Sequence, residues 1–398
     1  MNLYIVSIVI TILIIGGNEF YFKTNYSVLR NALDIVGLLP VAIVSGLRNL
    51  NVGTDINHYV VPNFTAAQLF SDFFSYNTYV HSMTGNYLNA VNNTESGYNL
   101  IVFIVSRFTD NVHWLLFLLQ LLVLIFIVTS LKIFAKFLET SVTLGVIVYL
   151  LTLYPFTLNV MRQYLAASLV LLAFSTFFAK KKYTSLIILA GAYSIHKSAI
   201  MGLLILVGYM VYMSVTKKNH SFANIPLISM MAVMSAVLVG GNVLKLLQGS
   251  IQFLPFLNKY AASFAVTGGY KFSGILIYIF PDVLIIVMYF FVIFSSDFLK
   301  TNSKLWSYFG YLVTVSLLLN TLYLYQNVIP RLAIFIMIFR PVIIGTLINA
   351  LPKNMKIIFS GMLVLIFILV FYRILISGNG SVYPYQSDYI SNYIFNNY

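Results

Sequence analysis

The feature that most constrains this chain is a series of continuous apolar runs that recur along its whole length. A transmembrane helix needs about 20 such residues, whereas a transmembrane β-strand would alternate apolar and polar residues. The runs do not alternate, so the membrane spans are predicted to be helices. Only 8% of the residues are charged and 60% are hydrophobic, too few charges to cover a water-facing surface. The chain is therefore predicted to be an all-α polytopic membrane protein, which excludes soluble enzymes and nucleic-acid-binding modules.

We predict about twelve transmembrane helices in a single transmembrane domain, residues 1–398. Apolar runs somewhat shorter than usual are included where other apolar runs lie on both sides. They cover residues 2–17, 33–47, 111–131, 142–157, 160–179, 183–195, 198–214, 225–243, 272–295, 305–325, 331–350 and 356–376. The apolar stretch 98–108 is interrupted by Arg107 and then Asp110. We predict that it forms an interfacial or re-entrant helix.

The positions of Lys and Arg predict the orientation, because cytoplasmic loops carry an excess of both. With the N-terminus outside, every inner loop contains at least two basic residues: Lys23 and Arg30; Lys132 and Lys136; Lys180, Lys181 and Lys182; Lys217 and Lys218; Lys300 and Lys304; Lys353 and Lys356. Both termini are therefore predicted to be extracytoplasmic. The net charge of +13 is assigned to these loops and to anionic lipid headgroups rather than to nucleic acid.

Three longer segments are then external. They are residues 48–110 between the second and third spans, residues 244–271, and the Tyr-rich tail 377–398. Aromatic side chains such as those of the tail suit a lipid headgroup layer and stacking on sugars equally well.

A second set of cationic or titratable residues lies at the outer ends of the predicted helices: Arg48, Arg162, His196 and Arg331. Arginine makes bidentate contacts with phosphate oxygens, so these positions predict a cradle for a pyrophosphate. The alternative is that each is a snorkelling anchor or an interfacial side chain.

The segment GLRNLNVGTDINHYV at 46–60 contains further candidates. Gly53 and Thr54 predict a turn, and Asp55 and Tyr59 follow it. Arg48 and Asp55 either face one anionic sugar phosphate or form a structural ion pair, which is favoured when the two are taken alone. Further along, Glu95 is either a site residue or a solvated carboxylate.

Two ionisable residues fall inside predicted spans. Asp282 lies about ten residues into the ninth span and Arg340 about nine into the eleventh, so both reach a depth of roughly 14–15 Å. Opposite charges at one depth predict an ion pair between them, mainly structural, with a polar cavity as the alternative.

Several chemistries have no signature in the chain. There is no cysteine, hence no disulfide and no thiolate metal site. No DxD-type pair of carboxylates, HExxH, Walker loop or GxGxxG is present. We expect neither a metal site nor a cofactor.

The segments GLRNLNVGTD with Tyr59, ESGYNL, RQYLAASLVL, IHKSAI and PRLAIF, in this order, resemble the EpsG family of polysaccharide polymerases. That family is related to the Wzy-type O-antigen and capsule polymerases. The resemblance covers residues from about 40 to about 350 and rests on the order of the motifs and the helix spacing. One departure is Ser96, where relatives often have Pro after the Glu.

The resemblance implies an inverting, metal-independent glycosyltransferase of GT-C-like architecture in the bacterial plasma membrane. Such an enzyme moves the growing glycan from undecaprenyl pyrophosphate onto the non-reducing end of the next undecaprenyl-pyrophosphate-linked repeat unit. The lipid-linked oligosaccharide is thus donor and acceptor, and a chain-length regulator and a flippase are expected partners.

Carried over residue by residue, the resemblance matches the family's recurring polar positions to Arg48, Asp55, Arg162, His196 and Arg331, with Glu95 as a further candidate. We expect Arg162 and Arg331, assisted by Arg48, to bind the donor pyrophosphate and stabilise its developing charge. Either His196 or Asp55 would accept the proton of the acceptor hydroxyl.

Two other functions compete with the polymerase. A flippase or other transporter of lipid-linked oligosaccharide would place its site near the membrane midplane, where only Asp282 and Arg340 qualify. An O-antigen ligase-like glycosyltransferase would share the chemistry and differ in its acceptor. The clustering of polar groups at the outer helix ends favours a polymerase over a transporter.

Overall fold

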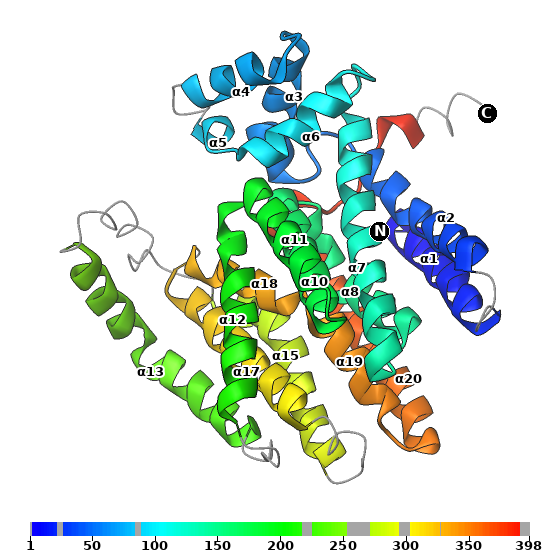
Figure 1. Cartoon of the computed structure of the whole chain (residues 1–398), viewed down its shortest axis with the longest axis vertical. Helices are drawn as coiled ribbons and strands as arrows, with labels where there is room; N and C mark the ends of the chain where they lie inside the picture. The colour runs from blue at the N-terminus through cyan, green and yellow to red at the C-terminus, as the bar shows by residue number, and fades with distance from the viewer. Residues whose placement is uncertain are drawn as a thin grey trace. The chain divides into compact units, whose positions relative to one another are not determined.

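The computed structural model describes residues 2–21, 27–83, 89–216, 225–252, 271–293, 303–326 and 328–390 (Figure 1). Within these ranges the regular structure is entirely helical, as the continuous apolar runs predict. The chain forms two compact units, residues 1–202 with 368–398 and residues 203–367. The boundary between them falls within two helices, α12 (Ile200–Val215) and α20 (Lys353–Ile376).

The first unit is built on a row of long helices. They are α1 (Asn2–Tyr21), α2 (Ser27–Gly46), α7 (His113–Leu138), α10 (Met161–Phe178) and α11 (Lys182–Ile195), each packed against the next. The shorter α8 (Val142–Thr152) packs against α1 and α7, and α9 (Tyr154–Thr157) follows it. The Glu19 carboxylate of α1 accepts hydrogen bonds from the backbone N–H groups of Val142 and Thr143, which caps the N-terminus of α8.

Short helices between α2 and α7 gather at one end of α7, α10 and α11 (Figure 1). They are the π-helix η1 (Ile56–Val60), α3 (Val61–Gln68), α4 (Phe73–Ser82), α5 (Asn89–Asn92) and α6 (Ser96–Ser106). Helix α6 contacts α3, α7 and α11. Two 3₁₀ helices, η2 (Lys197–Ala199) and η6 (Asn379–Ser381), complete this unit.

The second unit has α17 at its centre. Besides most of α12 and of α20, it contains α13 (Ile225–Gln252), α15 (Phe272–Ile293), α17 (Ser303–Thr321), η4 (Leu322–Leu324), η5 (Ile329–Ala333), α18 (Ile334–Met337) and α19 (Arg340–Asn349). Helix α17 packs against α13, α15, η5 and α18, and α15 also packs against α19.

Nine helical segments of the described residues are long and apolar enough to cross a membrane, rather than the twelve predicted. They are α1, α2, α7, α10, α12, α13, α17, the segment Arg331–Asn349 and α20. Apolar side chains such as Leu13, Leu238 and Leu365 are exposed on these helices, as expected where a helix faces lipid. The chain is a multi-pass membrane protein by helix length and hydropathy.

Two of the three remaining predicted spans fall short for local reasons. Residues 142–157 are divided at Leu153 between α8 and α9, because Pro155 has no N–H with which to continue the helix. Helix α11 has 14 residues, which extend only about 21 Å. The third, 272–295, contains the 22-residue helix α15, of which the described residues Ser273–Tyr289 form an apolar helix. The stretch 98–108 forms the 11-residue α6, which is also too short to span.

The orientation stays a prediction. Among the basic residues on which it depends, Lys23, Lys217, Lys218 and Lys300 lie outside the described residues, as do 84–88 of the segment 48–110, 253–270 of the segment 244–271 and 391–398 of the tail. The single domain predicted for residues 1–398 likewise stays a prediction.

Asp282 and Arg340 form an ion pair in the interior of the second unit, as their equal depth predicts. Arg340 Nε lies 2.6 Å from Asp282 Oδ1, and both side chains are 1% exposed. Ser316 donates to the other carboxylate oxygen at 2.6 Å, and Arg340 Nη2 donates to the carbonyl of Tyr278 at 2.6 Å. The pair therefore joins α15, α17 and α19.

Removal of one charge of this pair should destabilise the second unit strongly. Asp282→Ala leaves the Arg340 guanidinium buried without its carboxylate, and we expect the free energy of unfolding to fall by about 3–5 kcal/mol. The double variant Asp282→Leu with Arg340→Met removes both charges and should recover most of this loss. Thermal unfolding of the purified protein in detergent measures both; equal losses in the single and double variants would contradict a mainly electrostatic contribution.

Candidate functional site

The centre of the candidate site in the first unit is Arg162, in the first turn of α10. Its guanidinium carbon lies 4.3 Å from the ring centroid of Tyr59 and 5.6 Å from that of Tyr98. The two rings meet edge to face, with centroids 5.7 Å apart. An arginine over aromatic faces is stabilised by a cation–π interaction. Arg162 is thus held by residues of η1 and α6 at the start of a long helix.

Glu95 connects Arg162 to the turn between α11 and η2. Its Oε2 lies 2.7 Å from Arg162 Nη1, and its Oε1 accepts a hydrogen bond of 3.0 Å from the backbone N–H of Lys197. Arg162 Nη1 also donates to the carbonyl of Asn93 at 3.2 Å. Glu95 is therefore not a solvated loop carboxylate, but part of the cluster around Arg162.

His196 ends α11 in an extended conformation and begins η2. Its Nδ1 accepts a hydrogen bond of 3.2 Å from the backbone N–H of Ser198. Because a backbone amide can only donate, the proton of the neutral imidazole is on Nε2. In the neutral ring Nε2 is then the nitrogen that can donate.

Tyr59 links the arginine to Asp55. Its hydroxyl donates a hydrogen bond of 2.8 Å to Asp55 Oδ2. Burial, and secondly the nearby Asp55 carboxylate, raise the pKa of Tyr59 well above its usual value. The phenol therefore stays protonated and orients the carboxylate.

The turn before Asp55 is held against the turn before Arg162. Asn159 Oδ1 accepts hydrogen bonds from the Thr54 hydroxyl at 2.7 Å and the Asp55 backbone N–H at 3.3 Å. Gly53 has φ +105°, a conformation that residues with a Cβ rarely adopt. A Cβ there would lie 2.6 Å from the carbonyl oxygen of Leu158. Glycine is thus required for both its conformation and its size.

Arg48 was expected to help bind a pyrophosphate at the surface, but the structure places it in the interior. It is 1% exposed, and its guanidinium donates to the carbonyl oxygens of Ser45, Val52 and Leu158 at 2.8, 3.1 and 3.0 Å. Burial lowers its pKa, and nearby tyrosines, with Tyr4 the largest contributor, oppose that effect. It pairs neither with Asp55 nor with a solvent-facing group. In this structure Arg48 joins the end of α2 to the loop at Val52 and to the turn at Leu158.

The other predicted residues are in the second unit. Arg331 lies in η5 and is exposed; its participation in the same site stays a prediction. Asp282 and Arg340 form the interior pair described above. Within the described residues, no three His, Asp or Glu side chains are grouped so as to hold a metal ion.

The structure thus connects five of the predicted residues, Asp55, Tyr59, Glu95, Arg162 and His196, the last through the backbone of its neighbour Lys197. The sequence analysis did not single out Tyr98 or Asn159. Tyr98 lies inside the motif ESGYNL, and Asn159 lies three residues before Arg162, which begins the motif RQYLAASLVL. Nearness to a motif was therefore the available signal.

A helical multi-pass membrane protein with an arginine–carboxylate–tyrosine cluster at its helix ends is the class that these features define. The EpsG family model matches residues 31–387 of the chain. The chain belongs to the EpsG family, which is linked to exopolysaccharide biosynthesis. No curated protein and no solved structure matches it.

Gly53 offers a test of how the site is positioned. Gly53→Ala adds strain at φ +105° and a contact of 2.6 Å with Leu158, so it should displace the turn that carries Asp55. The matched control is Gly378→Ala, where φ is +72° and no atom lies within 4 Å of the added Cβ. The control should show only the backbone strain, about 1–2 kcal/mol. Thermal unfolding in detergent compares them, and equal destabilisation would argue against the close packing of Gly53 on Leu158.

Proposed function

We propose that this protein is a polysaccharide polymerase, an inverting glycosyltransferase that acts on lipid-pyrophosphate-linked glycans. The proposal is supported by membership of the EpsG family and by the helical membrane class. The observation that carries it is the connected cluster of Arg162, Glu95, Tyr59 and Asp55. That cluster combines a cation suited to phosphate with a carboxylate suited to proton transfer.

In the proposed reaction, a hydroxyl oxygen of the acceptor sugar attacks the anomeric carbon of the donor glycan. The bond between that carbon and the pyrophosphate oxygen breaks, and the lipid pyrophosphate leaves with the electron pair. The hydroxyl proton passes to a base of the protein. This sequence inverts the configuration at the anomeric carbon and forms no covalent enzyme intermediate.

Arg162 is proposed to bind the donor pyrophosphate and stabilise the charge that develops as it leaves. Its guanidinium can make bidentate contacts with phosphate oxygens. The Tyr98 hydroxyl beside it is buried and has no hydrogen-bond partner in the described structure. A buried unpaired donor costs about 1–3 kcal/mol, a cost that an oxygen atom of the ligand would remove.

Asp55 is the proposed base. Its carboxylate is oriented by the hydrogen bond from the Tyr59 hydroxyl. An ionised carboxylate has two oxygen atoms, and either can accept a proton. His196 is the other candidate base from the sequence. In its neutral ring, Nδ1 accepts a hydrogen bond from Ser198 and the proton is on Nε2, so neither nitrogen is free to accept a proton from substrate. His196 is better suited to donate a hydrogen bond to substrate than to accept its proton.

The remaining parts of the proposal come from the family. The architecture is GT-C-like and the reaction metal-independent. Donor and acceptor are undecaprenyl-pyrophosphate-linked repeat units, used at the outer face of the bacterial plasma membrane. A chain-length regulator and a flippase are the proposed partners.

Arg162→Ala should abolish long-chain polymer, since the donor pyrophosphate loses its principal cation. The matched control is Arg107→Ala, which removes another arginine that lies over an aromatic ring, Phe103, and bonds to backbone carbonyls. The control should retain polymer. Glycan length is read from a gel ladder in cells that express each variant at equal membrane levels.

The pattern of loss distinguishes the competing functions. A ladder that collapses to one repeat unit supports the polymerase. Loss of all surface glycan points instead to a flippase, and polymer retained on its lipid carrier points to a ligase. Unchanged polymer length in Arg162→Ala would overturn the proposed role of Arg162.

Tyr59 separates the two interactions within the cluster. Tyr59→Phe removes the hydrogen bond to Asp55 but keeps a ring beneath Arg162, whereas Tyr59→Leu removes both. A hydrogen bond to a charged group contributes about 1.5–3 kcal/mol, so Tyr59→Phe should lower the polymerisation rate about ten- to a hundredfold. Tyr59→Leu should lower it further. Transfer of a radiolabelled repeat unit in isolated membranes measures the rate, and wild-type activity in Tyr59→Phe would show that Asp55 needs no orientation by the phenol.

A further inference from the structure

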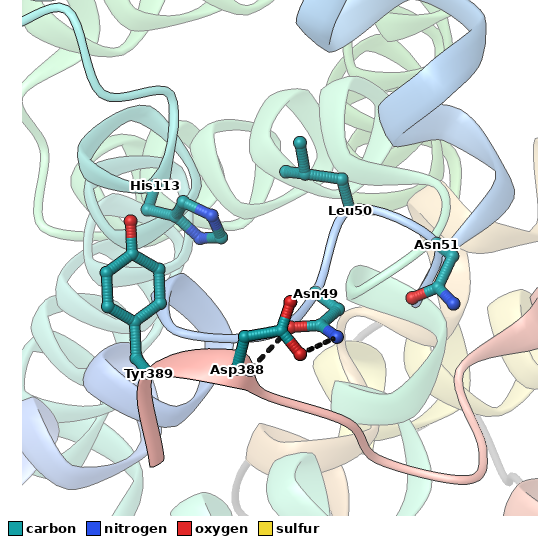
Figure 2. Close-up of a pocket in the computed structure, with 6 residues that line it drawn as sticks. All are labelled: Asn49, Leu50, Asn51, His113, Asp388 and Tyr389. Carbon is teal, nitrogen blue, oxygen red and sulfur yellow. Dashed lines mark hydrogen bonds between the residues drawn. The ribbon is translucent and has the colours of Figure 1, made fainter. Parts of the chain in front are cut away.

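Two pockets of the first unit adjoin each other at the junction of α2, α7 and the C-terminal segment. One, of about 510 Å³, is lined by Asn49, Leu50, Asn51, His113, Asp388 and Tyr389 (Figure 2). The other, of about 490 Å³, is lined mainly by Leu39, Ile43, Leu47, Trp114 and Phe117. His113 and Tyr389 line both. A polar pocket therefore continues directly into an apolar groove.

The change from apolar to polar coincides with the ends of two candidate membrane spans. The groove follows the last turns of α2 and the first turns of α7, whereas Asn49 and Asn51 lie just beyond Gly46, the last residue of α2. Trp114 is 58% exposed in the first turn of α7, the depth at which tryptophan is enriched in membrane proteins. A ligand that fills both pockets must have an apolar chain on the membrane side and a polar headgroup beyond it.

Hydrogen bonds between the end of α2 and the C-terminal segment hold the lining of the polar pocket in place. Asn49 Nδ2 donates to Asp388 Oδ1 at 2.8 Å, and the Asp388 backbone N–H donates to Asn49 Oδ1 at 2.7 Å (Figure 2). The Asn49 backbone N–H donates to the carbonyl of Gln386, and the Ser387 hydroxyl donates to the carbonyl of Leu47 at 2.6 Å. These bonds hold the C-terminal segment against the end of α2.

Aromatic groups form the wall that the two pockets share. The rings of His113 and Tyr389 meet edge to face with centroids 4.9 Å apart. His113 Nδ1 lies 2.7 Å from the carbonyl oxygen of Gly46, so Nδ1 carries the proton and Nε2 of the neutral ring is an acceptor. The wall thus offers ring faces and edges together with a hydrogen-bond acceptor.

The lining selects against an anionic headgroup. It contains two amides, a phenol and an imidazole, and its one formally charged side chain is the carboxylate of Asp388. A phosphate would face that carboxylate without a lysine or arginine in the lining. Amides, a carboxylate and aromatic rings instead suit a group with many hydroxyls, which both donates and accepts hydrogen bonds and stacks its C–H faces on rings.

We propose that these two pockets form a binding site for a glycolipid with an uncharged sugar headgroup. The headgroup occupies the pocket of Asn49, Asn51 and Asp388, and one hydrocarbon chain lies in the groove of Ile43 and Trp114. The site shares no lining residue with the Arg162 cluster. Binding there is measured without polymerisation, so its outcome is independent of the proposed function.

The fluorescence of Trp114 provides a direct test. The chain has 2 tryptophans, and the substitution Trp306→Phe leaves Trp114 as the single one. That protein, in lipid nanodiscs, is titrated with a diglucosyl diacylglycerol brominated on its acyl chains, which quenches nearby tryptophan. Phosphatidylcholine and phosphatidylglycerol with the same brominated chains are the comparison lipids. The proposal expects saturable quenching by the glycolipid and only proportional, non-saturating quenching by the two phospholipids.

Two variants and a matched control locate the effect. Asn51→Leu removes a headgroup contact, and Ile43→Phe narrows the groove; each should weaken the apparent affinity for the glycolipid at least fivefold. Val36→Phe alters an exposed residue of α2 outside the groove and should leave it unchanged. Stronger or equal quenching by phosphatidylglycerol, identical quenching by all three lipids, or insensitivity to both variants would overturn the proposal.

Discussion

The arrangement of the candidate site depends on the hydrogen bonds of one buried guanidinium, that of Arg48. It joins the end of α2, through Ser45, to the following loop, through Val52, and to the turn before α10, through Leu158. Arginine is suited to this role because its rigid fork presents several donors at once, whereas lysine presents a single point charge. The carbonyls at the end of a helix and in two turns have no partner within regular structure. Arg48 satisfies several of them together and so sets the distance between the loop of Asp55 and the start of α10.

The sequence favoured a different role for Arg48, as one of the ligands of a pyrophosphate, because its buried position is not visible in the sequence. An arginine at the end of an apolar helix is equally compatible with an outward-facing ligand and an inward-facing tether, and the helical period does not distinguish them beyond the last turn. The surrounding tyrosines, such as Tyr4 and Tyr154, come from other helices. Their proximity is a tertiary property, invisible in local sequence.

The positions of the helices and the Asp282–Arg340 pair were predictable for one common reason. A helix rises by a constant 1.5 Å per residue, so both the existence of a span and the depth of a charge follow from counting. Counting fails where the helix is interrupted. Pro155 divides one predicted span, and α11, with 14 residues, is too short to cross a membrane. Within the described residues fewer segments are long and apolar enough to span than the twelve predicted, while the described part of each predicted segment is mainly helical.

The candidate site has a charge balance that bears on the proposed reaction. Glu95 neutralises Arg162 and is itself held by the backbone of Lys197, so in the absence of ligand the half-buried arginine retains a partner. A pyrophosphate that binds Arg162 must share it with this carboxylate, and the repulsion between the two anions limits its affinity. Under the proposed function this limit is useful, because the lipid pyrophosphate left after each transfer must depart before the next substrate binds. In the proposed reaction, an arginine without a carboxylate partner would bind donor and leaving group tightly alike, and tight binding of the leaving group would slow turnover.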